Sequence, residues 1–172
     1  MSETLARVLC QRLRDAGHDA YVAGGYVRDA LLERASGDLD LATSATPDQV
    51  MALFEHAHPT GLQHGTVTVI EGGEAIEITT FRAEGDYSDG RRPDKVQFVS
   101  RIEDDLKRRD FTVNAIAWDP LEDRYIDPFD GMADLQSRTL RTVGVARERF
   151  DEDALRLLRA MRFTATHHFM PA

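Results

Sequence analysis

Two aspartates separated by one residue, Asp38 and Asp40, have the types and spacing best suited to chemistry in this chain. They alternate with Leu39 and Leu41, so in a strand the carboxylates share one face and the leucines share the other. Carboxylates held this close repel each other, and a bound divalent cation is the simplest way to relieve the repulsion. Because the donors are oxygens only, the pair predicts a magnesium site.

A glycine pair precedes these aspartates. Gly24 and Gly25 end a short apolar run and open a predicted helix from Tyr26 to about Arg34. Bare backbone N–H groups at such a helix start can approach a phosphate. Beside a magnesium-binding carboxylate pair, this start indicates chemistry on a nucleoside triphosphate. Taken alone, an Asp-x-Asp pair is more often a surface or capping feature, and the sequence has no Walker-type, dinucleotide-binding or EF-hand motif.

The composition narrows the class of protein. With 172 residues, 42% hydrophobic and 30% charged, the chain has the composition of an ordinary soluble protein with one good core. A formal net charge of −9 argues against a generic basic nucleic-acid-binding module, although a local basic stripe is compatible with it. The single cysteine, Cys10, fits a reducing cytoplasm. No apolar run approaches membrane-spanning length, so we expect no membrane partner.

The elements that must position these residues follow from periodicity and turn signals. Alternating segments predict a hairpin whose returning strand carries Glu77, with Ile76 and Ile78 on the opposite face. If this strand neighbours the Asp38 strand, Glu77 is a third carboxylate of the site; the alternative is a solvent-facing glutamate. The pattern predicts helices over residues 3–16, 47–54 and 101–107, with His56 to His58 at a helix end, and strands over 64–70, 75–82, 116–119, 124–127 and 139–143.

A helical pattern from residue 147 carries the other candidate residues. Leu155, Leu158 and Phe163 fall on its apolar side, while Asp153, Arg156 and Arg159 recur every three residues along one stripe. An ordinary salt-bridged helix face is one interpretation of that stripe. Nucleobase recognition is the other, because a carboxylate accepts from the exocyclic amine of cytosine or adenine while an arginine donates to the adjacent ring acceptor. Guanine and uracil present a carbonyl at that position, so such a pair rejects both.

Several strings resemble one enzyme family. Residues 24–29 (Gly-Gly-Tyr-Val-Arg-Asp) and 38–43 (Asp-Leu-Asp-Leu-Ala-Thr) are similar to the signature of class II tRNA nucleotidyltransferases and bacterial poly(A) polymerases, which are polymerase-β-like nucleotidyltransferases. Residues 77–82, 87–93, 108–115 and 152–156 are similar to further motifs of that family, in the same order. The resemblance runs from about residue 20 to residue 163.

The resemblance implies a fold and a set of roles. The fold class is α/β (α+β), with a catalytic head of residues 1–145 built on a mixed five-stranded sheet with flanking helices, and the start of a helical neck over 146–172. By resemblance, Asp38 and Asp40 are catalytic and bind magnesium. Glu77 lies in a family string, and both interpretations of it, a third carboxylate of the site and a solvent-facing glutamate, stay open. The residues implied in nucleotide binding are Gly25, Arg28, Arg109, Asp153, Arg156, Arg159 and Arg162.

The resemblance also implies an activity. The expected reaction is CCA addition, in which CTP and ATP serve as donors, the tRNA 3′ end is the acceptor and pyrophosphate is released without a covalent enzyme intermediate; no DNA partner is expected. An intact loop at 87–93 favours an enzyme that completes the terminal adenosine step. The alternatives are an A-adding enzyme, a poly(A) polymerase or a non-catalytic nucleotide-binding module. The family continues into helical domains that grip tRNA, so the chain is expected to be a catalytic core or a short homologue.

Overall fold

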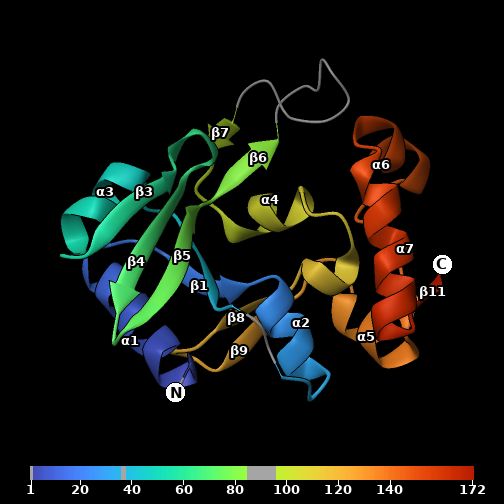
Figure 1. Ribbon diagram of the computed structural model, residues 1–172, viewed down its shortest axis with the longest axis horizontal. Helices are drawn as coiled ribbons and strands as arrows, with labels where there is room; N and C mark the ends of the chain where they lie inside the picture. The colour runs from blue at the N-terminus through green and yellow to red at the C-terminus, as the bar shows by residue number, and fades with distance from the viewer. Residues whose placement is uncertain (1, 36–37, 85–95) are drawn as a thin grey trace.

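A mixed sheet forms the centre of the protein (Figure 1). The computed structural model describes residues 2–35, 38–84 and 96–172. Within them, seven strands follow the order β3-β4-β5-β2-β1-β8-β9. The β2–β5 pair is parallel and the other neighbours are antiparallel. The strands are β1 (Ala20–Ala23), β2 (Asp40–Thr43), β3 (Ala57–Gly61), β4 (Thr66–Glu71), β5 (Glu74–Thr80), β8 (Ala117–Asp119) and β9 (Arg124–Ile126).

The predicted α/β class is confirmed, but the expected five-stranded sheet has seven strands in the part of the chain that the structure describes. The edge strand β3 is one reason for the difference. It contains Pro59, and none of its residues is buried, so it lacks the alternation of apolar and polar residues that predicts a strand. The prediction of a helix end at His56 to His58 is therefore wrong, because α3 ends at Leu53 and β3 begins at Ala57.

Helices pack on the sheet and extend beyond one side of it (Figure 1). In α1, residues Ala6, Leu9, Cys10 and Leu13 are fully buried and form the apolar face of the helix. The helices are α1 (Ser2–Asp15), α2 (Gly25–Leu31), α3 (Pro47–Leu53), α4 (Ile102–Lys107), α5 (Gly131–Ser137), α6 (Ala146–Glu152) and α7 (Leu155–His167). The short elements are η1 (Leu62–His64), η2 (Thr112–Asn114) and the strand pairs β6 (Arg82–Glu84) with β7 (Val96–Phe98) and β10 (Thr139–Leu140) with β11 (Met170–Pro171).

The two adjacent strands β2 and β5 divide apolar from acidic side chains, as the alternation predicts. Leu41 on β2 and Ile76 and Ile78 on β5 are buried in the core, together with Leu39 just before β2. The intervening carboxylates remain exposed on the other face of the sheet. The core thus fixes the register that brings the acidic side chains together.

The predicted continuous C-terminal helix is interrupted. At Asp153 the backbone is extended, with φ −146° and ψ 106°, and this residue separates α6 from α7. The prediction that Leu155 and Leu158 face the core is wrong, because they are 44% and 62% exposed. Phe163, the third residue predicted on the apolar side, is buried at 1% exposed, and Arg156 is buried beside it at 4% exposed. Arg156 and Phe163 are seven residues apart, about two turns, so they lie on the same face of α7. That face, which includes Arg156, packs against the rest of the molecule.

The segment after α7 pairs with a segment that precedes α6 in the chain. The predicted strand over 139–143 is shorter than expected, because only Thr139 and Leu140 form β10. This strand pairs in parallel with β11, which the sequence did not predict, and Phe169 just before β11 is fully buried. The pair joins the segment after α7 to the segment that follows α5.

Candidate active site

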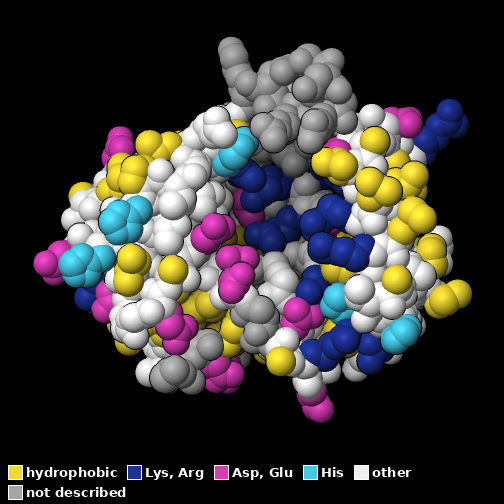
Figure 2. Space-filling view, viewed as in Figure 1, with side chains coloured by type: hydrophobic (Ala, Val, Ile, Leu, Met, Phe, Trp, Pro, Cys, Tyr) yellow, Lys and Arg dark blue, Asp and Glu magenta, His cyan; other side chains and the backbone are white. Residues whose placement is uncertain are grey.

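A cleft of about 570 Å³ opens between the sheet and α7. Figure 2 shows Lys and Arg side chains gathered in a hollow of this face, with Asp and Glu side chains on the neighbouring surface. The basic cluster explains how a chain of net charge −9 can still offer a binding site for an anion. The cleft is lined by Gly24, Gly25, Arg28, Asp40, Arg108, Arg109, Asp110, Asn114, Asp153, Arg156, Arg159, Arg162 and Phe163.

Carboxylates occupy one wall of the cleft. Asp40 on β2 is the register partner of Glu77 on β5, and both side chains are exposed on the same face. Loss of solvent around its carboxylate, followed by the charge of Glu77, raises the pKa of Asp40 from 3.8 to about 6. Asp38 adds to this rise and Arg109 opposes it. The wall therefore holds excess negative charge that a cation would relieve.

The carboxylates of Asp38 and Asp40 fit magnesium as one part of its coordination shell. In the described parts of the chain, no three Asp, Glu, His or Cys side chains converge closely enough to hold a metal ion by themselves. Magnesium is commonly bound by one or two carboxylates, with substrate phosphates and water completing its shell. The Asp38–Asp40 pair fits that arrangement, because the neighbouring arginines would place phosphate oxygens beside it.

Arg109 lies against the glycine turn at the start of α2. Gly24 has φ +89°, and a Cβ there would lie 2.8 Å from Nη1 of Arg109, so only glycine leaves room for the guanidinium. Nη2 donates to the buried Asp105 at 3.3 Å, whereas the buried Nε has no hydrogen-bond partner among the described residues. Burial lowers the pKa of Arg109 and Asp105 opposes the change. A buried cation with an unused donor is suited to binding an anionic ligand.

Arg28 projects from α2 into the same cleft. Its Nε and Nη2 donate to both oxygens of Asp29 at 2.9 and 2.8 Å, and its Nη1 donates to Oδ1 of Asn114 at 2.8 Å. The guanidinium also lies 5.1 Å from the ring centroid of Phe163. These contacts fix the orientation of Arg28 before any ligand arrives.

The α6–α7 segment forms the other wall. Asp153 accepts from the backbone N–H of Leu155 at 2.8 Å, so it caps the start of α7. Nη1 of Arg156 donates to Glu152 at 2.6 Å and to the carbonyl of Arg149 at 3.0 Å. Nε of Arg159 donates to Asp110 at 2.6 Å. Although Asp153 is not on the helix that carries Arg156 and Arg159, all three line the cleft.

The structure brings nearly all of the predicted site residues together. Asp38 lies outside the lining, two residues before β2, and acts on the cleft through the charge it adds beside Asp40. Residues 87–93, predicted as a functional loop, lie outside the described residues. Three residues that line the cleft as well, Asp110, Asn114 and Phe163, had no predicted role in the site. Asp110 and Asn114 lie within the string 108–115, which was a signal for them, and Phe163 was predicted only on the apolar side of its helix.

Among the residues described, no helix combines the length and the apolar character needed to cross a bilayer.

Comparison with known proteins identifies related sequences and structures. Residues 20–141 match the family described as the poly A polymerase head domain. A CCA-adding enzyme of Lactobacillus delbrueckii subsp. bulgaricus is 53% identical over 166 residues, which are 96% of this chain and 42% of that enzyme. The chain thus spans about two fifths of the length of this curated relative.

Solved structures agree with this match. The Bacillus stearothermophilus CCA-adding enzyme in complex with CTP superposes with a TM-score of 0.91 at 47% identity, covering 99% of this chain and 41% of that one. The Thermotoga maritima CCA-adding enzyme complexed with tRNA_CCA superposes with a TM-score of 0.77 at 28% identity, covering 98% of this chain and 38% of that one.

Proposed function

Because the chain belongs to the poly A polymerase head domain family, we propose that it is the nucleotide-transferring part of a CCA-adding enzyme. It transfers CMP from CTP and AMP from ATP to the 3′ end of tRNA and releases pyrophosphate. One observation carries the proposal: a single cleft joins an acidic wall at Asp40 to arginines from three separate segments. The relatives named CCA-adding enzyme, one of them solved with CTP, support the choice of substrates.

The triphosphate is assigned to the glycine turn and its arginines. Gly25 offers backbone at the start of α2, and Arg28 and Arg109 bring guanidinium groups to the same cleft. Charge-assisted contacts of this kind hold phosphate groups and orient the reacting one for in-line attack. The position of Arg109 against the glycine turn supports this assignment.

Asp38 and Asp40 are the residues that would hold magnesium. When bound, magnesium neutralises charge on the phosphate oxygens and lowers the pKa of the attacking 3′-hydroxyl. The two carboxylates also fix where that hydroxyl and the α-phosphate meet, because β2 is a rigid element of the sheet. Glu77 lies beside this pair and keeps the local charge negative.

Base selection is assigned to Asp153 and Arg156, with Arg159 and Arg162 as further nucleotide contacts. An aspartate acceptor beside an arginine donor matches the amine and ring nitrogen that cytosine and adenine share. Each good bidentate contact discriminates by about 1–3 kcal/mol against a base that lacks the pattern. The cleft therefore admits CTP and ATP and disfavours UTP and GTP. We assign the head to residues 1–145 and the start of the neck to 146–172, and place the reaction in the cytoplasm.

The test is a primer-extension assay with the chain as it stands. It is incubated with magnesium and a tRNA transcript that lacks its CCA end, and CTP and ATP are offered separately and together. We expect sequential C, C and A addition, and no addition by the isosteric variant Asp40→Asn. Binding of CTP and ATP is measured in parallel by calorimetry, so that a failure to grip RNA is separated from a failure to bind nucleotide.

The outcomes distinguish the candidate functions. A-only addition would reassign the chain to an A-adding enzyme or a poly(A) polymerase. Nucleotide binding without transfer, persisting when the chain is joined to the body of a related CCA-adding enzyme, would reduce it to a nucleotide-binding module. Transfer by Asp40→Asn at the rate of the wild type would contradict the assigned metal site.

A further inference from the structure

The cleft arginine Arg28 is held by a neighbour that it would not face by helix geometry alone. In α2, Nε and Nη2 of Arg28 donate to Oδ1 and Oδ2 of Asp29 at 2.9 and 2.8 Å. Consecutive residues of a helix point about 100° apart, and their side chains do not face each other. The pair therefore calls for a contact from outside α2 that holds the Asp29 carboxylate beside Arg28.

That contact comes from the end of α7. His167, the last residue of this helix, places Nε2 3.4 Å from Oδ1 of Asp29, the same oxygen that accepts from Nε of Arg28. The side chains of His167 and Asp29 are only 15% and 16% exposed, so water screens the attraction between them weakly. The carboxylate of Asp29 thus lies between a guanidinium of α2 and an imidazole of α7.

Two buried aromatic rings fix the position of the imidazole. His167 stacks on Phe169, with centroids 5.8 Å apart and an interplanar angle of 8°, and its centroid lies 5.4 Å from that of Phe163. Phe163 and Phe169 are 1% and 0% exposed. Nδ1 of His167 lies 2.7 Å from the hydroxyl of Thr166. Held by these contacts, the ring directs its remaining nitrogen, Nε2, at Asp29.

The charges around His167 determine where its proton lies. The charged groups that face the ring are Asp29, Arg28 and Arg34. Burial, followed by the charge of Arg28, lowers the pKa of His167 below its ordinary value of 6.5, and Asp29 opposes the change. The ring is therefore neutral at pH 7.5 and carries one proton. Because a carboxylate can only accept, the contact with Asp29 places that proton on Nε2.

We propose that His167 is a positioning residue for the triphosphate. Its Nε2–H holds the carboxylate of Asp29, and Asp29 holds the guanidinium of Arg28 toward the phosphates. The inference rests on the proposed function, since it takes Arg28 as a triphosphate contact. His167 lies outside the lining of the cleft and need not touch the nucleotide. Its effect is therefore on phosphate affinity, equal for every nucleotide, and not on the choice of base.

His167→Leu tests the role of the donor. The variant removes Nε2 and keeps an apolar side chain against Phe163 and Phe169. The hydroxyl of Thr166 still donates to the carbonyl of Arg162 at 2.8 Å, so the substitution leaves no polar partner unpaired there. Dissociation constants for inorganic tripolyphosphate, CTP and UTP are measured by calorimetry at pH 7.5, with magnesium and without RNA. We expect all three affinities to fall about tenfold, while the ratio of CTP to UTP affinity stays within about twofold.

His167→Gln separates this role from a purely structural one. The glutamine amide supplies an N–H donor at about the reach of Nε2 but has no ring to stack on Phe169. It should restore tripolyphosphate affinity to within about twofold of the wild type. Arg28→Met supplies a second criterion, because once Arg28 is absent the addition of His167→Leu should cause no further loss. A purely structural role predicts instead that glutamine fails like leucine and that the two losses add.

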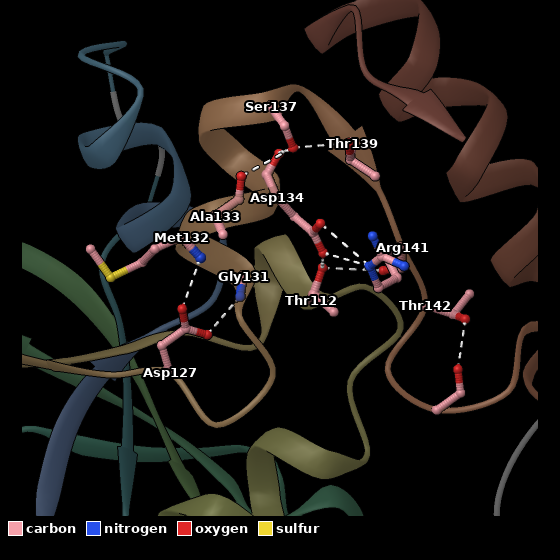
Figure 3. A network of polar contacts seen from close by, with 11 residues as sticks. Thr112, Asp127, Gly131, Met132, Ala133, Asp134, Ser137, Thr139, Arg141 and Thr142 are labelled. Carbon is pink, nitrogen blue, oxygen red and sulfur yellow. Dashed lines mark hydrogen bonds and ion pairs between the residues drawn. The ribbon is translucent and has the colours of Figure 1, made fainter. Parts of the chain in front are cut away.

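Two control variants complete the set. His168→Gln changes the next residue, which is exposed, and should leave all three affinities unchanged. Asp134→Asn changes a buried aspartate of α5 that accepts from Thr112 at 2.6 Å and from Arg141 at 3.2 Å, outside the cleft (Figure 3). It should lower the unfolding temperature and leave tripolyphosphate affinity unchanged, which separates a loss of stability from a loss of phosphate binding.

The outcomes for the inference and for the proposed function are distinct. Wild-type tripolyphosphate affinity in His167→Leu, or a loss that His167→Gln shares in full, would overturn the inference. A further loss on adding His167→Leu to Arg28→Met would overturn it as well. A wild-type chain that binds neither tripolyphosphate nor CTP would contradict the proposed function itself.

Discussion

Asp40 and Glu77 are register partners on the parallel strands β2 and β5, so two exposed carboxylates lie side by side above a core of leucine and isoleucine. The sheet determines this proximity, because shifting one of these strands by one residue would bury its own acid and expose its apolar side chains. The two carboxylates repel each other in the folded protein, and a bound cation would relieve this repulsion.

The stability of the metal-free protein should depend on the ionisation of Asp40. The pKa of Asp40 is raised from 3.8 to about 6 in the folded state, so between these values the folded state binds more protons than the unfolded state. Its contribution to stability is therefore greatest below pH 4, falls as the pH rises to about 6 and is constant above that. Thermal unfolding of the wild type and Asp40→Asn, compared from pH 4 to pH 8 with EDTA, should show the variant gaining relative stability over this interval. Magnesium at pH 7.5 should stabilise only the wild type, and a difference curve that is flat with pH would contradict the assignment.

Glu77→Gln separates a neighbouring charge from a metal ligand. Glu77 raises the pKa of Asp40, so its neutral variant should lower that pKa and shift the pH midpoint of cation binding downward. Because the described carboxylates form no three-ligand cluster, we expect cation affinity at pH 8 to change by less than about threefold, roughly 0.7 kcal/mol. Calorimetric titration with Mn²⁺ at pH 6 and pH 8 measures both effects. A large loss of affinity at pH 8 would instead make Glu77 a direct ligand.

The sequence predicted the acidic wall because its signal is local. Alternation of acids with leucines or isoleucines specifies the faces of single strands, and the structure has those faces at Asp40 and Glu77. The predicted strand does not reach Asp38, because β2 begins at Asp40. The sequence did not predict that β2 and β5 are parallel neighbours, because strand pairing depends on connections between distant segments. The adjacency of Asp40 to Glu77 was therefore left open by the sequence.

In α7, the periodicity of apolar residues does not fully predict which side chains are buried. Counting apolar residues placed Leu155 and Leu158 in the core, yet the buried face of α7 carries Arg156 and Phe163. The local pattern was misleading because this face contacts a charged cleft, where buried arginines have acidic partners such as Glu152 and Asp110. The contacts of Asn114 with Arg28 and of Asp110 with Arg159 connect residues 86 and 49 positions apart, so no short window of sequence contains them.

Asp153→Ala should change base choice and helix stability together. The carboxylate caps the backbone N–H of Leu155 and also lines the cleft where we place the nucleobase. Loss of the cap should cost about 0.5–2 kcal/mol of unfolding free energy. Loss of the acceptor should reduce discrimination against UTP by about 1–3 kcal/mol while transfer continues.

Asp153→Ser is the matched variant for this site, because a serine hydroxyl can replace the cap but not the charged acceptor. It should restore the unfolding temperature without restoring the rejection of UTP. Both quantities come from thermal unfolding and from competition between CTP and UTP in single-nucleotide extension. A variant that keeps full rejection of UTP would argue against a base-reading role for Asp153.

Gly24→Ala should damage the site through Arg109. Gly24 has φ +89° and ψ −138°, a backbone region that side chains rarely adopt, and the added Cβ would lie 2.8 Å from Nη1 of Arg109. We expect a loss of about 1–3 kcal/mol in unfolding free energy from the strain. Because the guanidinium must also move away, tripolyphosphate binding should weaken, whereas Gly72→Ala, with φ +62° in the β4–β5 turn and no atom within 4 Å, should lose stability alone. Calorimetry and thermal unfolding of both variants separate the two effects: equal tripolyphosphate affinity in the two variants would mean that Arg109 does not hold the triphosphate.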